Sequence, residues 1–243
     1  MRALRIDGYK LTDIVKCGEF GGKADNGTLK ERFALNRLNE QITVIKQHIC
    51  KPYVPIRHNE NVYEVTKAVD TPGTPKSDFH LVTGDGEEVF WISHKDGKSP
   101  KCFQQWGGLS AKTESKINSH PETQLFISQV KATYSQGVPR ATTVAKKIHD
   151  STLKHLTVYG NEYGAEESRQ NVSAVIQGNV QVEESKSEFR ITGDICHYNG
   201  QLISGAYEPI FVATMRNDRS NEGIPNTRLS ITPIEGRKIT QWF

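Results

Sequence analysis

The chain has 243 residues, 35% of them hydrophobic and 24% charged, which is enough for one large domain or two small ones with a real core. Its net charge of +3 permits a polyanionic partner without requiring one. No apolar run approaches the roughly 18 residues of a membrane helix, and the N-terminal segment has no signal-peptide pattern, so we expect a cytoplasmic protein with no membrane partner.

The cysteines favour a reducing compartment. Cys17, Cys50, Cys102 and Cys196 are scattered and form no CxxC pair. This spacing indicates neither a zinc knuckle nor a redox pair, so reduced thiols are expected.

The strongest helix pattern covers approximately Thr28 to Ile49. Thr28 and Glu31 match a capping box, and Pro52 stops the pattern. One apolar stripe recurs at steps of three and four residues, at Leu35, Leu38, Ile42, Ile45 and Ile49.

Strand and helix patterns alternate through the next hundred residues. Val62–Val69 reads as a strand, and a hairpin follows it. Ser99 and Pro100 favour the start of a helix that ends at Gly107. Two further helices are expected over 120–137, with Leu125, Phe126, Val130 and Tyr134 inward, and over 139–156.

The last part of the chain is rich in predicted strands. These cover 172–182, 187–195, 209–215 and 227–233, separated by turns rich in Gly and Asn. We therefore expect a mixed α/β (α+β) fold with an α/β part at 1–157 and a β-rich C-terminal part at 158–243. The pattern leaves open whether these form one domain or two.

The hairpin over 74–97 combines a core face with a polar face. Asp85-Gly86 is a favoured two-residue type I′ turn, and counting outward from it pairs His80 with Trp91 and Asp78 with Ser93. One face then carries Asp78, His80, Val82, Val89, Trp91, Ser93 and Lys95, and the other carries Phe79, Leu81, Phe90 and Ile92.

This register places Asp78 and Lys95 on one face, diagonal to each other and about 7–8 Å apart between backbones. A carboxylate of this kind can bind a hard divalent cation, and a lysine beside it can stabilise negative charge on a phosphate. A structural ion pair at a sheet edge is the other interpretation of the same pattern.

The segment Pro75-Lys76-Ser77-Asp78, followed by a strand ending Ile92-Ser93-His94-Lys95, resembles the PD-(D/E)xK nuclease superfamily. The variant that it resembles is restriction endonuclease-like, with Ser-x-Lys in place of Glu-x-Lys. The resemblance implies a mixed central sheet flanked by helices. It also implies phosphodiester hydrolysis with Mg²⁺ or Mn²⁺, in which Asp78 binds the metal and Lys95 activates water.

Ser93 departs from the superfamily pattern, which has an acid at this position. Either the acid has moved, with Glu31 as the candidate because it continues the inward stripe of the first helix, or activity is lost. The expected catalytic set is therefore Asp78, Lys95, Glu31 and Ser93, with Asp78 and Glu31 as metal ligands. Glu31 could instead only close its capping box.

Candidate DNA contacts lie elsewhere in the chain. The resemblance suggests Gln104 and Gln105 after the lysine strand, and Lys23 follows a Gly-Gly turn. Arg216 and Arg219 lie in a loop that offers phosphate or base contacts, although interleaved acids also fit a solvated loop.

Two functions from different classes follow. The first is a Mg²⁺-dependent DNA endonuclease of phage or bacterial defence or DNA processing, acting as a homodimer, as two-fold target sites favour. The alternative is an inactive nuclease-fold protein that binds DNA or serves as a phage structural component, and Ser93 is its main support.

Overall fold

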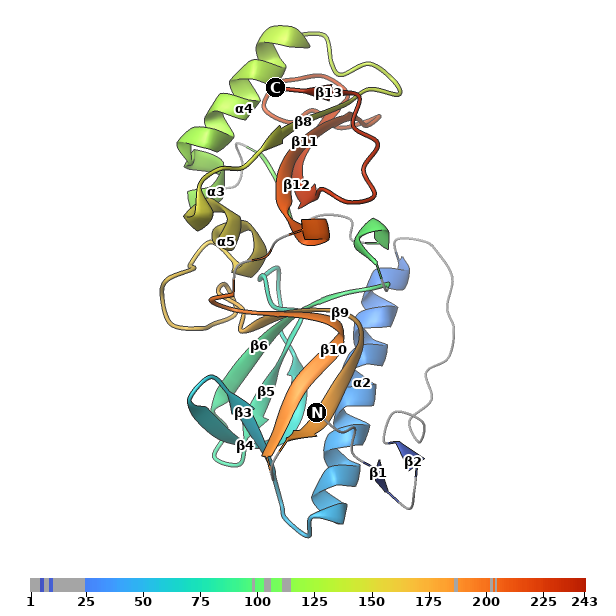
Figure 1. Ribbon diagram of the computed structural model, residues 1–243, viewed down its shortest axis with the longest axis vertical. Helices are drawn as coiled ribbons and strands as arrows, with labels where there is room; N and C mark the ends of the chain where they lie inside the picture. Colours follow the sequence, from blue (N-terminus) through green and yellow to red (C-terminus); the bar gives the residue numbers. More distant parts are fainter. Residues whose placement is uncertain are drawn as a thin grey trace. The chain divides into compact units, whose positions relative to one another are not determined.

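The computed structural model describes residues 5–6, 9–10, 25–97, 99–102, 106–110, 115–185, 188–201, 203 and 205–243. The chain divides into two compact units (Figure 1). Unit 1 comprises 1–98 and 167–199, and unit 2 comprises 99–166 and 200–243. This division differs from the expected boundary after residue 157, because a late segment returns to complete the first unit.

The described residues of unit 1 form one long helix on a closed mixed sheet, with a small separate hairpin. Within the described residues the sheet order is β10-β3-β4-β5-β6-β9, and β6–β9 and β10–β3 are the parallel pairs. The elements are β1 (Arg5–Ile6), β2 (Tyr9–Lys10), α2 (Asp25–His48), β3 (Val54–His58), β4 (Asn61–Asp70), β5 (Phe79–Thr83), β6 (Glu88–Lys95), β9 (Ala174–Ser185) and β10 (Glu188–Tyr198).

Unit 2 is a second sheet with short helices. Its strands follow the order β13-β8-β11-β12-β7 in the described part of the chain. The elements are η1 (Pro100–Cys102), β7 (Gly107–Gly108), α3 (Lys116–Ser119), α4 (Pro121–Thr133), β8 (Thr143–Lys147), α5 (Ser151–Tyr159), η2 (Gly205–Tyr207), β11 (Pro209–Met215), β12 (Thr227–Pro233) and β13 (Gln241–Trp242).

These elements confirm the expected α+β class with a mixed sheet and flanking helices. None of the helices among the described residues is long and apolar enough to cross a membrane.

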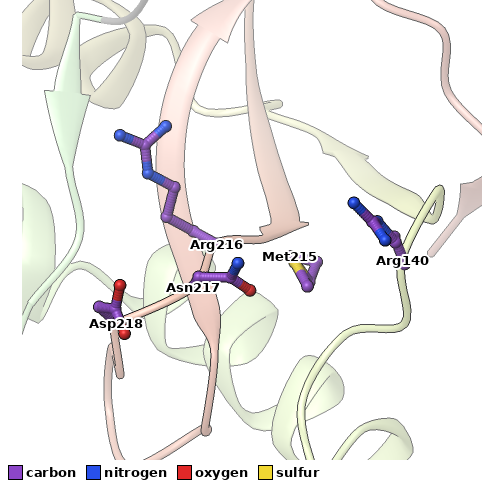
Figure 2. A pocket seen from close by; sticks show the side chains of 5 residues that line it. All are labelled: Arg140, Met215, Arg216, Asn217 and Asp218. Atoms are coloured by element: carbon purple, nitrogen blue, oxygen red, sulfur yellow. The ribbon is translucent and has the colours of Figure 1, made fainter.

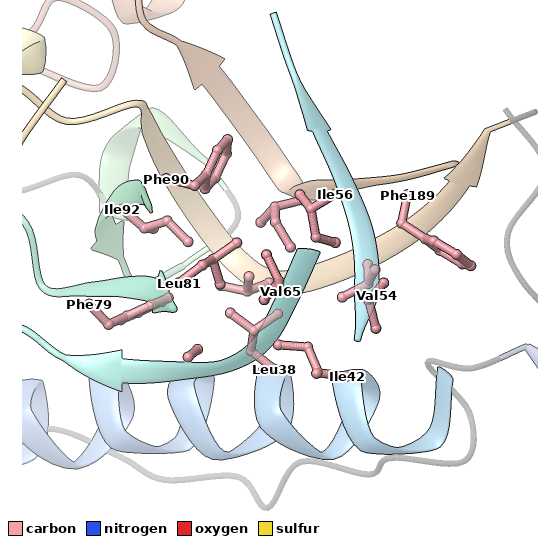
Figure 3. Close-up of a cluster of buried hydrophobic side chains, with 14 of the residues drawn as sticks. Leu38, Ile42, Val54, Ile56, Val65, Phe79, Leu81, Phe90, Ile92 and Phe189 are labelled. Carbon is pink, nitrogen blue, oxygen red and sulfur yellow. The ribbon is translucent and has the colours of Figure 1, made fainter. Parts of the chain in front are cut away.

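The apolar stripe of α2 builds the core of unit 1. Leu38, Ile42 and Ile45 are fully buried, and Leu35 and Ile49 pack at the margin of the same cluster. Figure 3 shows Leu38 and Ile42 pointing from the helix into side chains of the sheet. Burying each such side chain stabilises the fold by about 1.5–3 kcal/mol.

The start of α2 corrects the predicted capping box. The helix begins at Asp25, so Thr28 lies inside it and cannot be its N-cap residue. Glu31 is consequently a helix-interior residue rather than the third residue of a first turn.

The structure also corrects three helix predictions. Residues 139–156 form strand β8 followed by α5 rather than one helix. Of the helix expected from Ser99 to Gly107, Pro100–Cys102 form the single turn η1, residues 103–105 lie outside the described residues, and Gly107 belongs to strand β7. In α4, Phe126 and Val130 are buried as predicted, but Leu125 is 49% exposed.

Candidate functional site

The hairpin β5–β6 has the predicted residue pairing near its open end but a different pairing near its turn. Its turn is a three-residue loop, 84–86, in which Gly86 has a φ of +92° and the Thr83 N–H donates to the Glu87 carbonyl at 3.0 Å. The two-residue type I′ turn is therefore wrong, and Val82 pairs with Glu88 instead of Val89.

A bulge then restores the predicted register. The register shifts between His80 and Leu81, opposite Phe90, whose φ is +47°. Beyond the bulge, His80 pairs with Trp91 and Phe79 with Ile92, as expected. Val89 moves to the core face, where it joins the buried cluster.

Asp78 and Lys95 come together at the open end of this hairpin. The Asp78 N–H donates to the Ile92 carbonyl at 2.8 Å, which fixes the residue against β6. Lys95 Nζ lies 3.5 Å from Asp78 Oδ2, and both side chains are partly exposed. A carboxylate and an ammonium group therefore share one solvent-accessible end of the sheet.

The same carboxylate oxygen is held from two other directions. The backbone N–H of His94 donates to Asp78 Oδ2 at 2.5 Å, and the Ser93 hydroxyl lies 3.4 Å from it. Ser93 is fully buried. The structure thus places Ser93 as a hydrogen-bond donor that orients Asp78, a role that a second acid at this position could not fill.

Glu31 is brought to the same site from α2. Burial is the main cause that raises the pKa of Glu31, followed by the negative charge of Asp78, while Lys95 opposes the shift and Asp70 adds to it. The neighbouring Lys30 forms an ion pair with Asp96, the residue after Lys95. This pair ties the first half of α2 to the end of β6.

Lys76 is a further charged residue at this site that the sequence reasoning did not select. The pKa of Lys76 is lowered to about 7, mainly by burial and then by the Lys95 charge, while Asp78 opposes the shift. Its backbone N–H donates to the Arg169 carbonyl at 3.1 Å. The signal was available, because Lys76 precedes Asp78 by two residues within the quoted motif.

The candidate DNA contacts have different outcomes. Arg216 and Arg219 lie exposed in the connection between β11 and β12 of unit 2. Arg216 lines a pocket with Arg140 and Met215 (Figure 2). The predictions for Lys23, Gln104 and Gln105 fall outside the described residues.

Within the described residues, no group of three or more His, Cys, Asp or Glu side chains could hold a metal ion. The acidic part of the candidate site therefore consists of Glu31 and Asp78, with Asp70 contributing charge.

Comparison with known proteins places this geometry in context. The chain is 29% identical over 155 residues to the type II restriction enzyme CviJI of Paramecium bursaria Chlorella virus IL3A. The match covers 61% of this chain and 42% of the viral enzyme, so the chain spans under half of that relative. No protein-family model and no solved structure match the chain.

Proposed function

We propose that this protein is a DNA endonuclease that hydrolyses phosphodiester bonds with the help of a divalent cation. The observation that carries the proposal is the contact of Asp78 with Lys95 at the open end of the hairpin, close enough to Glu31 of α2 for both charges to shift its pKa. The partial likeness to a type II restriction enzyme supports the same activity class.

The acids at the site fit Mg²⁺ or Mn²⁺. Mg²⁺ in proteins is usually held by one or two carboxylates together with substrate phosphates, and Glu31 and Asp78 supply such a pair. The charge of Asp78 raises the pKa of Glu31, so the two groups create a negative potential that a cation would offset. When bound, the metal would lower the pKa of a water molecule and offset charge on the phosphate.

The other residues of the site have two proposed roles: Lys95 supplies positive charge, and Ser93 and His94 orient the Asp78 carboxylate. Lys95 presents a compact positive charge that orients the attacking water or stabilises the charge developing on the phosphate. The Ser93 hydroxyl and the His94 N–H hold the Asp78 carboxylate in place, which limits the reorganisation needed when substrate binds.

DNA is the proposed partner, and a homodimer is the proposed assembly because a two-fold protein matches a two-fold target site. A role in phage biology or bacterial defence accords with the viral source of the relative.

A non-catalytic DNA-binding or phage structural protein is the second candidate. It is favoured by Ser93 in place of an acid and by the small number of acids that the described residues bring together.

Cleavage by the full-length Lys95→Ala variant tests the proposal. We expect wild type to cut plasmid DNA with Mg²⁺ or Mn²⁺, and the variant to cut roughly 100-fold more slowly or worse, because a charge that stabilises the transition state is removed. Lys67→Ala, on the exposed part of β4, is the control and should retain cleavage. Absence of metal-dependent cleavage by wild type would favour the second candidate, and full activity of Lys95→Ala would remove Lys95 from the site.

A further inference from the structure

A pocket of about 430 Å³ lies in unit 2. It is lined by Arg140, which precedes β8, and by Met215, Arg216, Asn217 and Asp218 at the end of β11. Figure 2 shows Arg140 across from the segment that carries the other four residues. Apart from Met215, which is partly buried, all of the lining residues are exposed.

The two segments that line the pocket are held in place by a network of backbone contacts. The Arg216 N–H donates to the Asn226 carbonyl at 2.8 Å, and the Thr227 N–H donates to the Arg219 carbonyl at 3.0 Å. The Val138 N–H donates to Thr227 Oγ1 at 3.0 Å, which joins the segment before Arg140 to the same loop.

The packing between these segments is close. A Cβ atom on Gly137 would lie only 2.3 Å from the Pro225 carbonyl oxygen. Ala141 and Asp218, beside and within the pocket, have φ values of +66° and +62°. Residues that are held in such sparsely populated conformations often lie at binding sites, where the surrounding structure maintains the strain.

Positive charge gathers around the pocket. The pKa of Arg228 is lowered first by burial and then by Arg219, Arg216 and Arg237. Arginines this close repel one another, and the repulsion favours an anionic partner such as nucleic acid.

The lining residues are unsuited to a simple phosphate site. Asp218 carries a carboxylate, which would repel a phosphate group. Asn217 offers both an acceptor and donors, and Arg140 and Arg216 offer only donors. Donors next to an acceptor match the edge of a DNA base that presents an acceptor beside an amino group.

We infer that this pocket receives a base edge of duplex DNA, with Arg140 and Arg216 donating hydrogen bonds to the base and Asp218 accepting one. The inference rests on the proposed function for its substrate, and it assigns sequence preference to unit 2. Phosphate contacts fix the position of a protein on DNA, whereas contacts to base edges select the sequence.

The test measures binding rather than cleavage. Full-length wild type, Arg216→Gln, Asp218→Asn and the control Lys147→Gln are each mixed with duplex oligonucleotides of randomised core sequence, with no divalent metal present. The bound fraction is then sequenced. Lys147 is an exposed cation on β8 that does not line the pocket.

We expect wild type and Lys147→Gln to enrich the same sequences. Arg216→Gln and Asp218→Asn should each lose preference at one base position by about 5-fold or more, since one good base contact provides discrimination of about 1–3 kcal/mol. Their binding to unselected duplex at low salt should change much less.

Three outcomes overturn the inference. The first is that the pocket variants keep the wild-type preference, and the second is that they weaken binding to all duplexes equally, as phosphate contacts would. A wild type without sequence preference also overturns it, whether or not that protein cleaves plasmid DNA. Conversely, a protein that selects sequences but fails to cleave would contradict the proposed function alone. Thermal unfolding of each variant confirms that the exposed substitutions leave the fold intact.

Discussion

Gln41 joins the long helix α2 to strand β9 through both ends of its side-chain amide. Its Nε2–H donates to the Val180 carbonyl at 3.1 Å, and its Oε1 accepts from the Val182 N–H at 2.9 Å. The pairing of β9 with β6 ends at Gln177, so these two backbone groups lie beyond the last β6 partner. The fully buried Gln41 side chain thus supplies the hydrogen bonds that a neighbouring strand would otherwise supply.

Replacing Gln41 with Leu should therefore destabilise the protein. The change leaves a buried N–H and a buried carbonyl without their partner, and each such group costs about 1–3 kcal/mol. We expect the free energy of unfolding in urea to fall by at least about 2 kcal/mol. Gln47→Leu, at an exposed position near the end of the same helix, should change it by less than about 0.5 kcal/mol. Equal effects of the two variants would contradict this account.

Glu31→Gln separates the proposed chemical role of Glu31 from a structural one. Because the folded protein raises the pKa of Glu31, its ionised form is less favourable in the folded state than in the unfolded state. A neutral side chain of the same shape should leave the free energy of unfolding unchanged or slightly higher at pH 7.5, while metal-dependent cleavage falls by roughly 100-fold or more. Glu40→Gln, exposed on the same helix, is the matched control. Retained cleavage would exclude Glu31 from the site.

The sequence was informative about single residues where a motif was short and local. The placement of Asp78 beside Lys95 was predicted from strand alternation and a two-residue turn. The turn was wrong, but the bulge opposite Phe90 restores the register, and the structure brings the two side chains into contact. The hydrogen bond from Ser93 to Asp78 and the closeness of Lys76 to both charges were not predicted. Both depend on side-chain orientation, which spacing along one strand does not specify.

The antiparallel strands β9 and β10 leave no room for a side chain at Gly193. A Cβ atom on Gly193 would lie 2.3 Å from Ile176 Cγ2 and 2.8 Å from the Asn179 carbonyl oxygen. The register of the pair shifts just after Gly193, and Asp194 accepts a hydrogen bond from the Asn179 N–H there at 3.1 Å. Gly193 therefore permits the β-bulge, and the hydrogen bond from the Asn179 N–H to Asp194 stabilises it.

Gly193→Ala should destabilise the protein by about 1–3 kcal/mol, because forcing extra atoms into a packed site displaces its neighbours. Gly84→Ala is the control, since its Cβ would meet only Thr66 Cγ2 at an ordinary 3.7 Å. Denaturant unfolding of both variants checks the prediction, and a neutral Gly193→Ala would show that the backbone relaxes at little cost.

Among the elements, strands bounded by clear turn residues were the most predictable. β11 and β12 have the predicted bounds, because their apolar residues and the flanking turn residues define them locally. The prediction of a helix over β8 is wrong. β8 pairs with β11 and with β13, which are both far away in the sequence. Such long-range pairing overrides the local helix preference of the segment, and the sequence of the segment itself does not indicate it.

At the scale of the whole molecule, four histidines are expected to lower the free energy of unfolding as the pH falls. Burial is the first cause that lowers the pKa of each of His80, His94, His155 and His197. An unfolded histidine titrates near pH 6.5. As the pH falls through that value, the unfolded chain binds protons that the folded chain does not, so stability falls with it.

We therefore expect the free energy of unfolding to decrease between pH 7.5 and pH 5.5, as measured in urea at fixed salt. His155→Gln should reduce this slope, because it removes a group that binds protons more readily when unfolded. His48→Gln, which removes an exposed group, should reduce it much less. Stability that rises as the pH falls over this range would contradict the assignment.

The chain's division into units was the least predictable feature. Near residue 158 the sequence pattern changes from mixed helices and strands to mainly strands, which suggested a boundary there. In the structure, β9 and β10 instead belong to the sheet of unit 1. Parallel pairing of β6 with β9 carries no local turn signal, since residues 99–166 of the second unit lie between the two strands in the sequence.

That returning segment has a consequence for the order in which the protein is made. The helix and hairpin that carry Glu31, Asp78 and Lys95 leave the ribosome well before the strand that pairs with Lys95 through Gln177. Until translation passes β9 and β10, the nascent first unit has an incomplete sheet with an uncovered edge. Completion of the candidate site would thus be postponed to late synthesis, after residues 99–166 of the second unit have emerged.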